Sequence, residues 1–320
     1  MTTPAECMVL GSNSPAGQDF IDLVLSETDW RVRAVSRSPE KPDFLLRYKS
    51  HRYAKHVAFE QRNLVLKPID FEHEYIVNFA AQSEVEPSWQ NPDDWFRTNV
   101  SMLTNPFWSR KSHMVQSYVQ LSTPEVYGSG THKPDASFNP STPYAMSKAS
   151  ADWLLSAYRR QFGLPVVSVR PANYYGPRQQ LWKIVPRTIL ACVNKTKFAL
   201  HADGADQRCF IHIRDASHGI LAALRGGKVG AAYHLTDQRL MTIREVVSIV
   251  AAAFNRTVED VTFPAPRRQG NDPLYHMLPA EPPGWEPRVK FEQGVDETIK
   301  WMRDNWAALQ QQPMEYVHRT

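Results

Sequence analysis

The sequence predicts an α/β fold: a Rossmann-type, doubly wound parallel sheet joined to a smaller mixed α/β lobe. Short apolar runs alternate with stretches of helical spacing, a glycine-containing turn follows the first run, and proline becomes frequent after about residue 176. Strands that alternate with helices form a parallel sheet covered on both faces. With 320 residues, 42% of them hydrophobic, the chain can bury the core of one large or two tightly coupled domains.

The expected elements follow in order along the chain. Apolar runs predict buried strands at residues 7–10, 32–35, 75–79, 118–122 and 166–169, and helical spacing is clearest at 20–25 and 149–162. We expect residues 1–175, rejoined by about 209–240, to form the sheet domain. Residues 176–208 and 241–320 should form the smaller lobe, which ends in an amphipathic helix at 295–309.

Composition and charge exclude several classes of function. Lys and Arg total 37 against 33 Asp and Glu, so the net charge of +4 is too dispersed for a nucleic-acid-binding face. No apolar run reaches the length of about 18 residues that crosses a membrane, and the first residues do not resemble a signal peptide. Three dispersed cysteines suggest neither disulfides nor a zinc site. We expect a cytoplasmic protein with no nucleic-acid, membrane or metal partner.

The turn GSNSPAG after the first strand has the spacing of a phosphate-binding loop. Gly11 and Gly17 would let backbone N–H groups approach a pyrophosphate, and Ser14 stands at the central position. An ordinary strand-to-helix turn is the alternative. Arg37 follows the second strand, where NAD sites usually carry a carboxylate, so it either favours NADP or is a plain loop arginine. The expected cofactor is therefore NAD or NADP.

The strongest catalytic signal lies in PYAMSK. Tyr144 and Lys148 are four residues apart and share a helix face, where an ammonium group beside the phenol favours the phenolate. Thr123 lies at the end of an apolar strand, in the segment STPEVYG. Combined with the glycine turn, this pattern predicts a catalytic tyrosine rather than a packing contact.

These segments resemble extended short-chain dehydrogenases/reductases of the nucleotide-sugar epimerase/dehydratase group, most closely the dTDP-glucose 4,6-dehydratases. The resemblance covers nearly the whole chain. Its matching segments are GSNSPAG, NFAAQSEVEPSW, RTNV, STPEVYGS, NPSTPYAMSKASAD, VRPANYYGPRQ, GADQRCFIHIRD and GWEPRVKFEQGVDETIKWM. It implies that the sheet domain binds NAD or NADP and that the smaller lobe binds a nucleotide-diphosphate sugar.

The resemblance also implies roles for single residues. The catalytic set is Thr123, Glu125, Tyr144 and Lys148. Together with Arg37, the expected cofactor-binding residues are Gly11, Ser14, Gly17, Asn63, Leu64, Ala80, Ala81, Gln82, Asn99, Tyr144, Lys148 and Pro171. The expected substrate-binding residues are Glu84, Thr123, Glu125, Asn173, Lys183, Arg208 and Arg268. Asn63 replaces a usual aspartate, and Asn99 would hold a water or the active-site backbone.

A 4,6-dehydratase would use Tyr144 to take the proton of the sugar 4-OH and Glu125 to remove the proton at C5. The dTDP-glucose enzymes carry an acidic aspartate where this chain has Pro124, and Glu84 replaces a usual histidine. Either Glu125 serves as base and then as acid, or the reaction stops before dehydration. We expect an NDP-hexose 4,6-dehydratase first, an NDP-sugar decarboxylase or 4-epimerase second, and a non-catalytic dinucleotide-binding regulator third.

The resemblance further implies a homodimer built as a four-helix bundle. The helices here would be residues 93–110 and 145–161. Candidates for the apolar seam are Trp95, Met102, Phe107, Trp153 and Leu154, and the alternative is that these side chains face the sheet.

Overall fold

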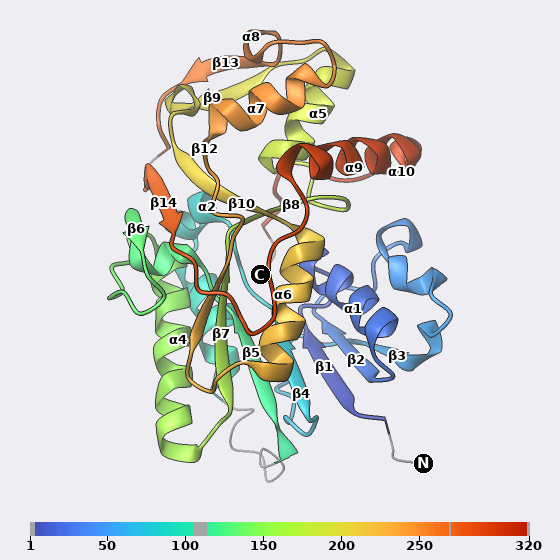
Figure 1. The fold of residues 1–320 in the computed structure, drawn as a ribbon, viewed down its shortest axis with the longest axis vertical. Helices are drawn as coiled ribbons and strands as arrows, with labels where there is room; N and C mark the ends of the chain where they lie inside the picture. The colour runs from blue at the N-terminus through green and yellow to red at the C-terminus, as the bar shows by residue number, and fades with distance from the viewer. Residues whose placement is uncertain (1–3, 105–113, 269, 319–320) are drawn as a thin grey trace.

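The computed structural model describes residues 4–104, 114–268 and 270–318. Figure 1 shows a sheet flanked by helices, with a smaller lobe packed at one end of it. In the described part of the chain, no helix is long and apolar enough to cross a membrane.

Across the described residues, seven strands form one parallel sheet in the order β11-β7-β5-β4-β1-β2-β3. They are β1 (Glu6–Leu10), β2 (Arg31–Ser36), β3 (Val57–Gln61), β4 (Tyr75–Asn78), β5 (Ser117–Leu121), β7 (Val166–Pro171) and β11 (Ala232–Leu235). The five strands expected from apolar runs are confirmed as β1, β2, β4, β5 and β7. The strand order reverses between β1 and β4, and such a switch point opens a crevice beyond the carboxyl ends of the strands.

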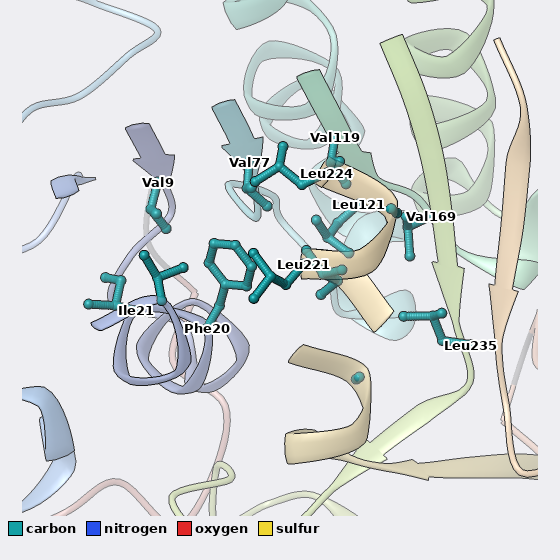
Figure 2. Close-up of a cluster of buried hydrophobic side chains, with 14 of the residues drawn as sticks. Val9, Phe20, Ile21, Val77, Val119, Leu121, Val169, Leu221, Leu224 and Leu235 are labelled. Carbon is teal, nitrogen blue, oxygen red and sulfur yellow. The ribbon is translucent and has the colours of Figure 1, made fainter. Parts of the chain in front are cut away.

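Helices cover both faces of this sheet. One face carries α1 (Pro15–Glu27) and α6 (Ile213–Gly226), and the other carries α4 (Pro143–Phe162), against which α2 (Val85–Gln90) and α3 (Pro92–Asn99) pack. Figure 2 shows Phe20 of α1 and Leu221 of α6 pointing toward strand side chains such as Val77. The alternating direction of strand side chains explains the two layers, because Val9 faces α1 while Met8 faces the α4 side.

The smaller lobe has its own sheet and core. Its larger sheet joins β6 (Gly130–His132), β8 (Asn173–Tyr175), β10 (Gln207–His212), β12 (Leu240–Thr242) and β14 (Leu274–Met277), and β9 (Phe198–His201) pairs with β13 (Thr262–Ala265). The helices are α5 (Ile184–Asn194), α7 (Ile243–Ala252), α8 (Val258–Val261), α9 (Phe291–Asp304) and α10 (Trp306–Leu309). The amphipathic helix expected at 295–309 is thus confirmed, in two pieces.

The helix expected over residues 93–110 is not continuous. Helix α3 ends at Asn99, and residues 101–103 form a short 3-10 turn. Trp95 and Met102, two candidates for the apolar seam, are buried within their own chain, which favours the alternative that they pack inside one subunit. Trp153 on α4 is 57% exposed, whereas Leu154 packs against the core. Phe107 lies outside the described residues.

Candidate functional site

A cavity of about 580 Å³ lies between the carboxyl ends of the large sheet and the smaller lobe. This is the position that the switch point of the strand order predicts. The expected site residues that line it are Ser14, Ala81, Glu84, Thr123, Glu125, Tyr144, Lys148, Pro171, Asn173, Lys183, Arg208 and Arg268. The structure therefore brings together the catalytic set and residues expected to contact the substrate.

The glycine turn forms one end of the cavity. Gly11 has a φ of +74°, and a Cβ there would lie 2.5 Å from the backbone nitrogen of Ala80, so only glycine fits. The Ser14 hydroxyl accepts a hydrogen bond from the N–H of Gly17 and caps α1, which explains a serine in the central position. A helix N-terminus that follows a glycine turn can hold a pyrophosphate through its free backbone N–H groups, so these residues fit a dinucleotide.

Eight expected cofactor residues are not among those that line the cavity: Gly11, Gly17, Arg37, Asn63, Leu64, Ala80, Gln82 and Asn99. Three of them lie just after strands β2 and β3. Arg37 follows β2, and its carbonyl accepts a hydrogen bond from Gln61. Asn63 and Leu64 follow β3: the Asn63 side chain accepts the N–H of Val65, and Leu64 packs against the core. Their contact with a cofactor stays a prediction.

Asn99 anchors the backbone at the end of β4. Its Oδ1 accepts the N–H of Gln82 at 2.9 Å, while its Nδ2 donates to the carbonyl of Gln82 at 3.0 Å and to Ser147 at 2.8 Å. The Ala80 N–H donates to Asn78 in the same bend. Of the two roles expected for Asn99, the structure contains the backbone contact, which ties the cofactor segment to α4.

Tyr144 and Lys148 lie on one face of α4, whose first turn is fixed by the Thr142 cap. The Thr123 hydroxyl hydrogen-bonds to the Tyr144 phenol, and the Lys148 ammonium donates to the carbonyl of Leu121 at 2.6 Å. Burial lowers the pKa of Lys148 to about 8, and Asp152 opposes this shift.

The electrostatics of Tyr144 differ from the sequence expectation. Burial raises the pKa of Tyr144 above its usual value, and the negative charge of Glu125 adds to the shift, whereas Thr123 lowers it. Lys148 gives its hydrogen bond to a strand-end carbonyl instead of the phenol. Lys148 therefore does not favour the phenolate of Tyr144 in this arrangement. The burial of Tyr144 raises its pKa, and the ammonium group of Lys148 is hydrogen-bonded to Leu121 instead.

A buried polar network lies behind this wall of the cavity. Asp152, one helical turn after Lys148, accepts hydrogen bonds from Ser122 and Arg170, each at 2.7 Å. Arg170 also donates to the Tyr127 hydroxyl at 2.8 Å, which meets His234 at 3.0 Å. Sequence reasoning missed this network, although the four-residue spacing of Lys148 and Asp152 on one helix face was a usable signal.

Glu125 is a carboxyl group that lines the cavity together with Tyr144. It follows Pro124 in a short 3-10 turn, where the Thr123 side chain accepts the Glu125 N–H at 3.3 Å. Burial raises its pKa to about 7, although Arg208 and Lys183 lower it. Its Oε2 is buried and has no hydrogen-bond partner among the described residues. A carboxyl with this pKa can both take up and release a proton near neutral pH.

The opposite wall carries the basic residues of the smaller lobe. Lys183 forms an ion pair with Glu84 at 2.7 Å, and Trp182 donates to the same carboxylate at 3.2 Å. Burial alone would raise the pKa of Glu84, but Lys183, Trp182 and Arg268 together hold it below its usual value.

Arg268 and Arg208 are held in different ways. Arg268 lies 3.4 Å from the carboxylate of Glu86, and Arg208 donates to the carbonyls of Gln207 and Asp272. Both side chains line the cavity, where guanidinium groups are suited to phosphate oxygens. No motif pointed to three further residues that line the cavity, namely Trp182, Glu315 and Tyr316.

Comparisons with known proteins agree with this geometry. The model of the NAD dependent epimerase/dehydratase family matches residues 7–235. A dTDP-glucose 4,6-dehydratase of Streptomyces antibioticus is 34% identical over 251 residues, which cover 76% of this chain and 75% of that protein. The crystal structure of a dTDP-glucose 4,6-dehydratase from Streptomyces venezuelae with NAD bound aligns with a TM-score of 0.86 and 26% identity, over 95% of this chain and 98% of that one.

A second solved structure shares the fold. The UDP-N-acetylglucosamine 4-epimerase of Methanobrevibacter ruminantium aligns with a TM-score of 0.82 at 21% identity, over 95% of this chain and all of that one. Dehydratases and epimerases therefore have the same architecture, and residues in the cavity must separate them. By the extent of the family match and by its similarity to the Streptomyces antibioticus protein, this chain belongs to the NAD dependent epimerase/dehydratase family.

Proposed function

We propose that the protein is a nucleotide-sugar 4,6-dehydratase that uses NAD. Its family and its similarity to two dTDP-glucose 4,6-dehydratases, one of them crystallised with NAD, support this proposal. The observation that carries it is Glu125, a partly buried carboxyl with a pKa of about 7 in the same cavity as Tyr144. Dehydration needs such a group at C5, whereas simple C4 epimerisation does not.

In this proposal the glycine turn and the end of β4 hold the dinucleotide, with Gly11, Ser14 and Gly17 at the pyrophosphate. Ala80, Ala81, Gln82 and Pro171 would flank it, and Arg37, Asn63 and Leu64 would approach its adenosine end. Lys183, Arg208, Arg268 and Asn173 would hold the nucleotide diphosphate of the substrate. The two basic groups now paired with Glu84 and Glu86 have charges suited to that anion.

Tyr144 takes the proton from the sugar 4-OH, and Thr123 hydrogen-bonds to the same oxygen. When bound, NAD supplies the hydride acceptor for oxidation at C4. The pKa of Lys148, near 8, keeps a positive charge beside this chemistry at neutral pH. Because burial and Glu125 hold the pKa of Tyr144 above its usual value, its phenol must first release its own proton to solvent before it can accept that of the 4-OH. Bound cofactor and substrate would therefore have to lower this pKa.

Glu125 then completes the elimination. The 4-keto group makes the C5–H bond acidic, so the Glu125 carboxylate removes this proton. The protonated Glu125 returns it to the C6 hydroxyl as the C6–O bond breaks, and water leaves. C6 of the resulting unsaturated ketone then takes back the hydride and C5 takes up a proton from solvent, which would leave the cofactor in its starting oxidation state. This double use explains how the site operates with Pro124, which has no proton to give.

Glu125→Gln tests this function. With a panel of NDP-hexoses, oxidation at C4 should still appear as cofactor reduction in a single turnover, while water loss falls by ~10²–10⁴-fold. In deuterated water the wild type should incorporate deuterium at C5 and the variant should not. Water loss and C5 deuterium incorporation by the variant at the wild-type rate would overturn the role of Glu125. An epimeric sugar without C5 deuterium from either protein would indicate a 4-epimerase, and release of carbon dioxide from a uronic acid would indicate a decarboxylase.

We further propose that residues 1–175 with 209–240 form the cofactor domain, apart from the short strands β6, β8 and β10, which join the sheet of the smaller lobe. We also propose that the enzyme works in the cytoplasm as a homodimer. Exposed Met146 and Trp153 on α4 support a contact between two copies of this helix. A monomer in light scattering at micromolar concentration would contradict the dimer.

A further inference from the structure

Residues 313–318, which we name the strap, run from the end of α10 back to the mouth of the cavity. Glu315 and Tyr316 of the strap line the cavity together with Tyr144 and Lys148. The strap therefore belongs to the site, although no motif in the sequence connects it to one.

On the sheet side, the strap binds the segment expected to hold the cofactor. The Tyr316 hydroxyl donates to Oε1 of Gln82 at 3.3 Å. His318 contacts the carboxylate of Asp94 at 2.8 Å and stacks on Trp95, with ring centroids 5.2 Å apart and planes 12° apart. These contacts join residues more than 200 positions apart in sequence.

On the lobe side, the strap contacts the substrate wall. The Tyr316 ring meets Trp182 edge to face, with centroids 5.9 Å apart, and Glu315 forms an ion pair with Arg187 at 3.5 Å. Burial and the charge of Glu84 raise the pKa of Tyr316, while Arg37 lowers it. Through Gln82 on one side and Trp182 and Arg187 on the other, the strap contacts both walls of the cleft.

We propose that the strap retains the bound dinucleotide and that Tyr316 is a cofactor-contact residue. This inference rests on the proposed function. A 4,6-dehydratase converts the sugar to its dehydrated ketone plus water and leaves the cofactor in its starting oxidation state, so no cofactor exchange is needed between turnovers. A segment that slows cofactor release therefore does not slow turnover.

Tyr316→Ala and a variant that ends at Gln312 test the strap against Met314→Ala. Met314 is exposed within the same segment, which makes it the matched control. Cofactor release is measured by loading each protein with NADH, adding excess NAD, and following NADH fluorescence. Tyr316→Ala should release NADH about tenfold faster, and the shortened chain at least as fast, whereas Met314→Ala should match the wild type.

Two further measurements keep the outcomes separate. Tyr316→Phe retains the contact with Trp182 but loses the hydrogen bond to Gln82, so its release rate should fall between those of wild type and Tyr316→Ala. Unfolding of cofactor-free Tyr316→Ala should match the wild type, because a general loss of fold would also speed release.

Equal rates of NADH release in all the variants would contradict the proposal that the strap retains the cofactor, while leaving the proposed function intact. Slower NADH binding by the wild type than by the shortened chain, with equal release, would instead identify a plug that blocks entry, and would also overturn retention. If none of the proteins binds NAD, the proposed function itself fails.

Discussion

The two walls of the cavity are held by different kinds of interaction. Behind Tyr144 and Lys148, the Asp152–Arg170 ion pair is almost completely buried, and each side chain is at most 5% exposed. On the facing wall, the side chain of Lys183 is 33% exposed and that of Arg268 is 43% exposed. The first wall is fixed by buried hydrogen bonds, and the second is held by ion pairs that water reaches.

This difference corresponds to two tasks. Proton transfer requires side chains that are held in place before the substrate arrives, which buried networks provide. Capture of a diphosphate requires cations that can exchange one anionic partner for another, and half-exposed pairs with Glu84 and Glu86 allow this at little cost. Variants on the two walls should therefore fail in different ways.

The largest difference should appear in turnover. Tyr144→Phe removes one oxygen from the fixed wall, so kcat should fall by ~10²–10⁴-fold or more while the protein keeps its fold and binds cofactor. Lys183→Met on the facing wall should instead raise KM with kcat nearly unchanged. Steady-state kinetics on an accepted NDP-hexose would check both. A wild-type kcat for Tyr144→Phe would contradict the proposed difference, in which one wall transfers protons and the other binds the diphosphate.

The second difference concerns stability. Arg170→Met leaves the buried Asp152 carboxylate without its ion-pair partner, so this substitution should lower the free energy of unfolding by about 3–5 kcal/mol. Arg268→Met breaks an exposed pair and should cost less than about 1 kcal/mol. Urea titrations of both variants provide the measurement. Adding Asp152→Leu to Arg170→Met should restore part of the loss, and no restoration would mean that the penalty does not come from an unpaired charge.

The smallest expected effect depends on pH. Burial raises the pKa of Glu125 from 4.5 to about 7, so the folded protein holds this proton more tightly than the unfolded chain and loses stability as pH rises through that interval. Glu125→Gln lacks this penalty. The variant should be more stable than the wild type at pH 8, by at most about 3 kcal/mol, and equal to it near pH 4. A pH-independent difference in melting temperature would contradict the raised pKa.

Sequence patterns predicted what depends on local spacing. Alternating apolar runs predicted β1, β4 and β7, and the four-residue interval of Tyr144 and Lys148 predicted one helix face. The prediction that Lys148 favours the phenolate of Tyr144 was wrong. The burial of Tyr144 and the hydrogen bond from Lys148 to Leu121 depend on how α4 packs on β5, which local spacing does not show. Tyr316 and Trp182 could not be predicted, since their contact joins two segments that only the complete fold brings together.

The buried network has a mechanical consequence. His234 lies in β11 of the large sheet, and its Nδ1 donates at 2.8 Å to the carbonyl of Leu278, just after β14 of the smaller lobe. Hydrogen bonds thus link the lobe, through Tyr127 and Arg170, to the helix that carries Tyr144. If the cavity opens while these hydrogen bonds stay intact, the smaller lobe has to rotate about the His234 side as a hinge. Helix α5 would then move outward. Amide hydrogen exchange that stays slow in β7 and β11 but rises in α5 would be the signature of this motion.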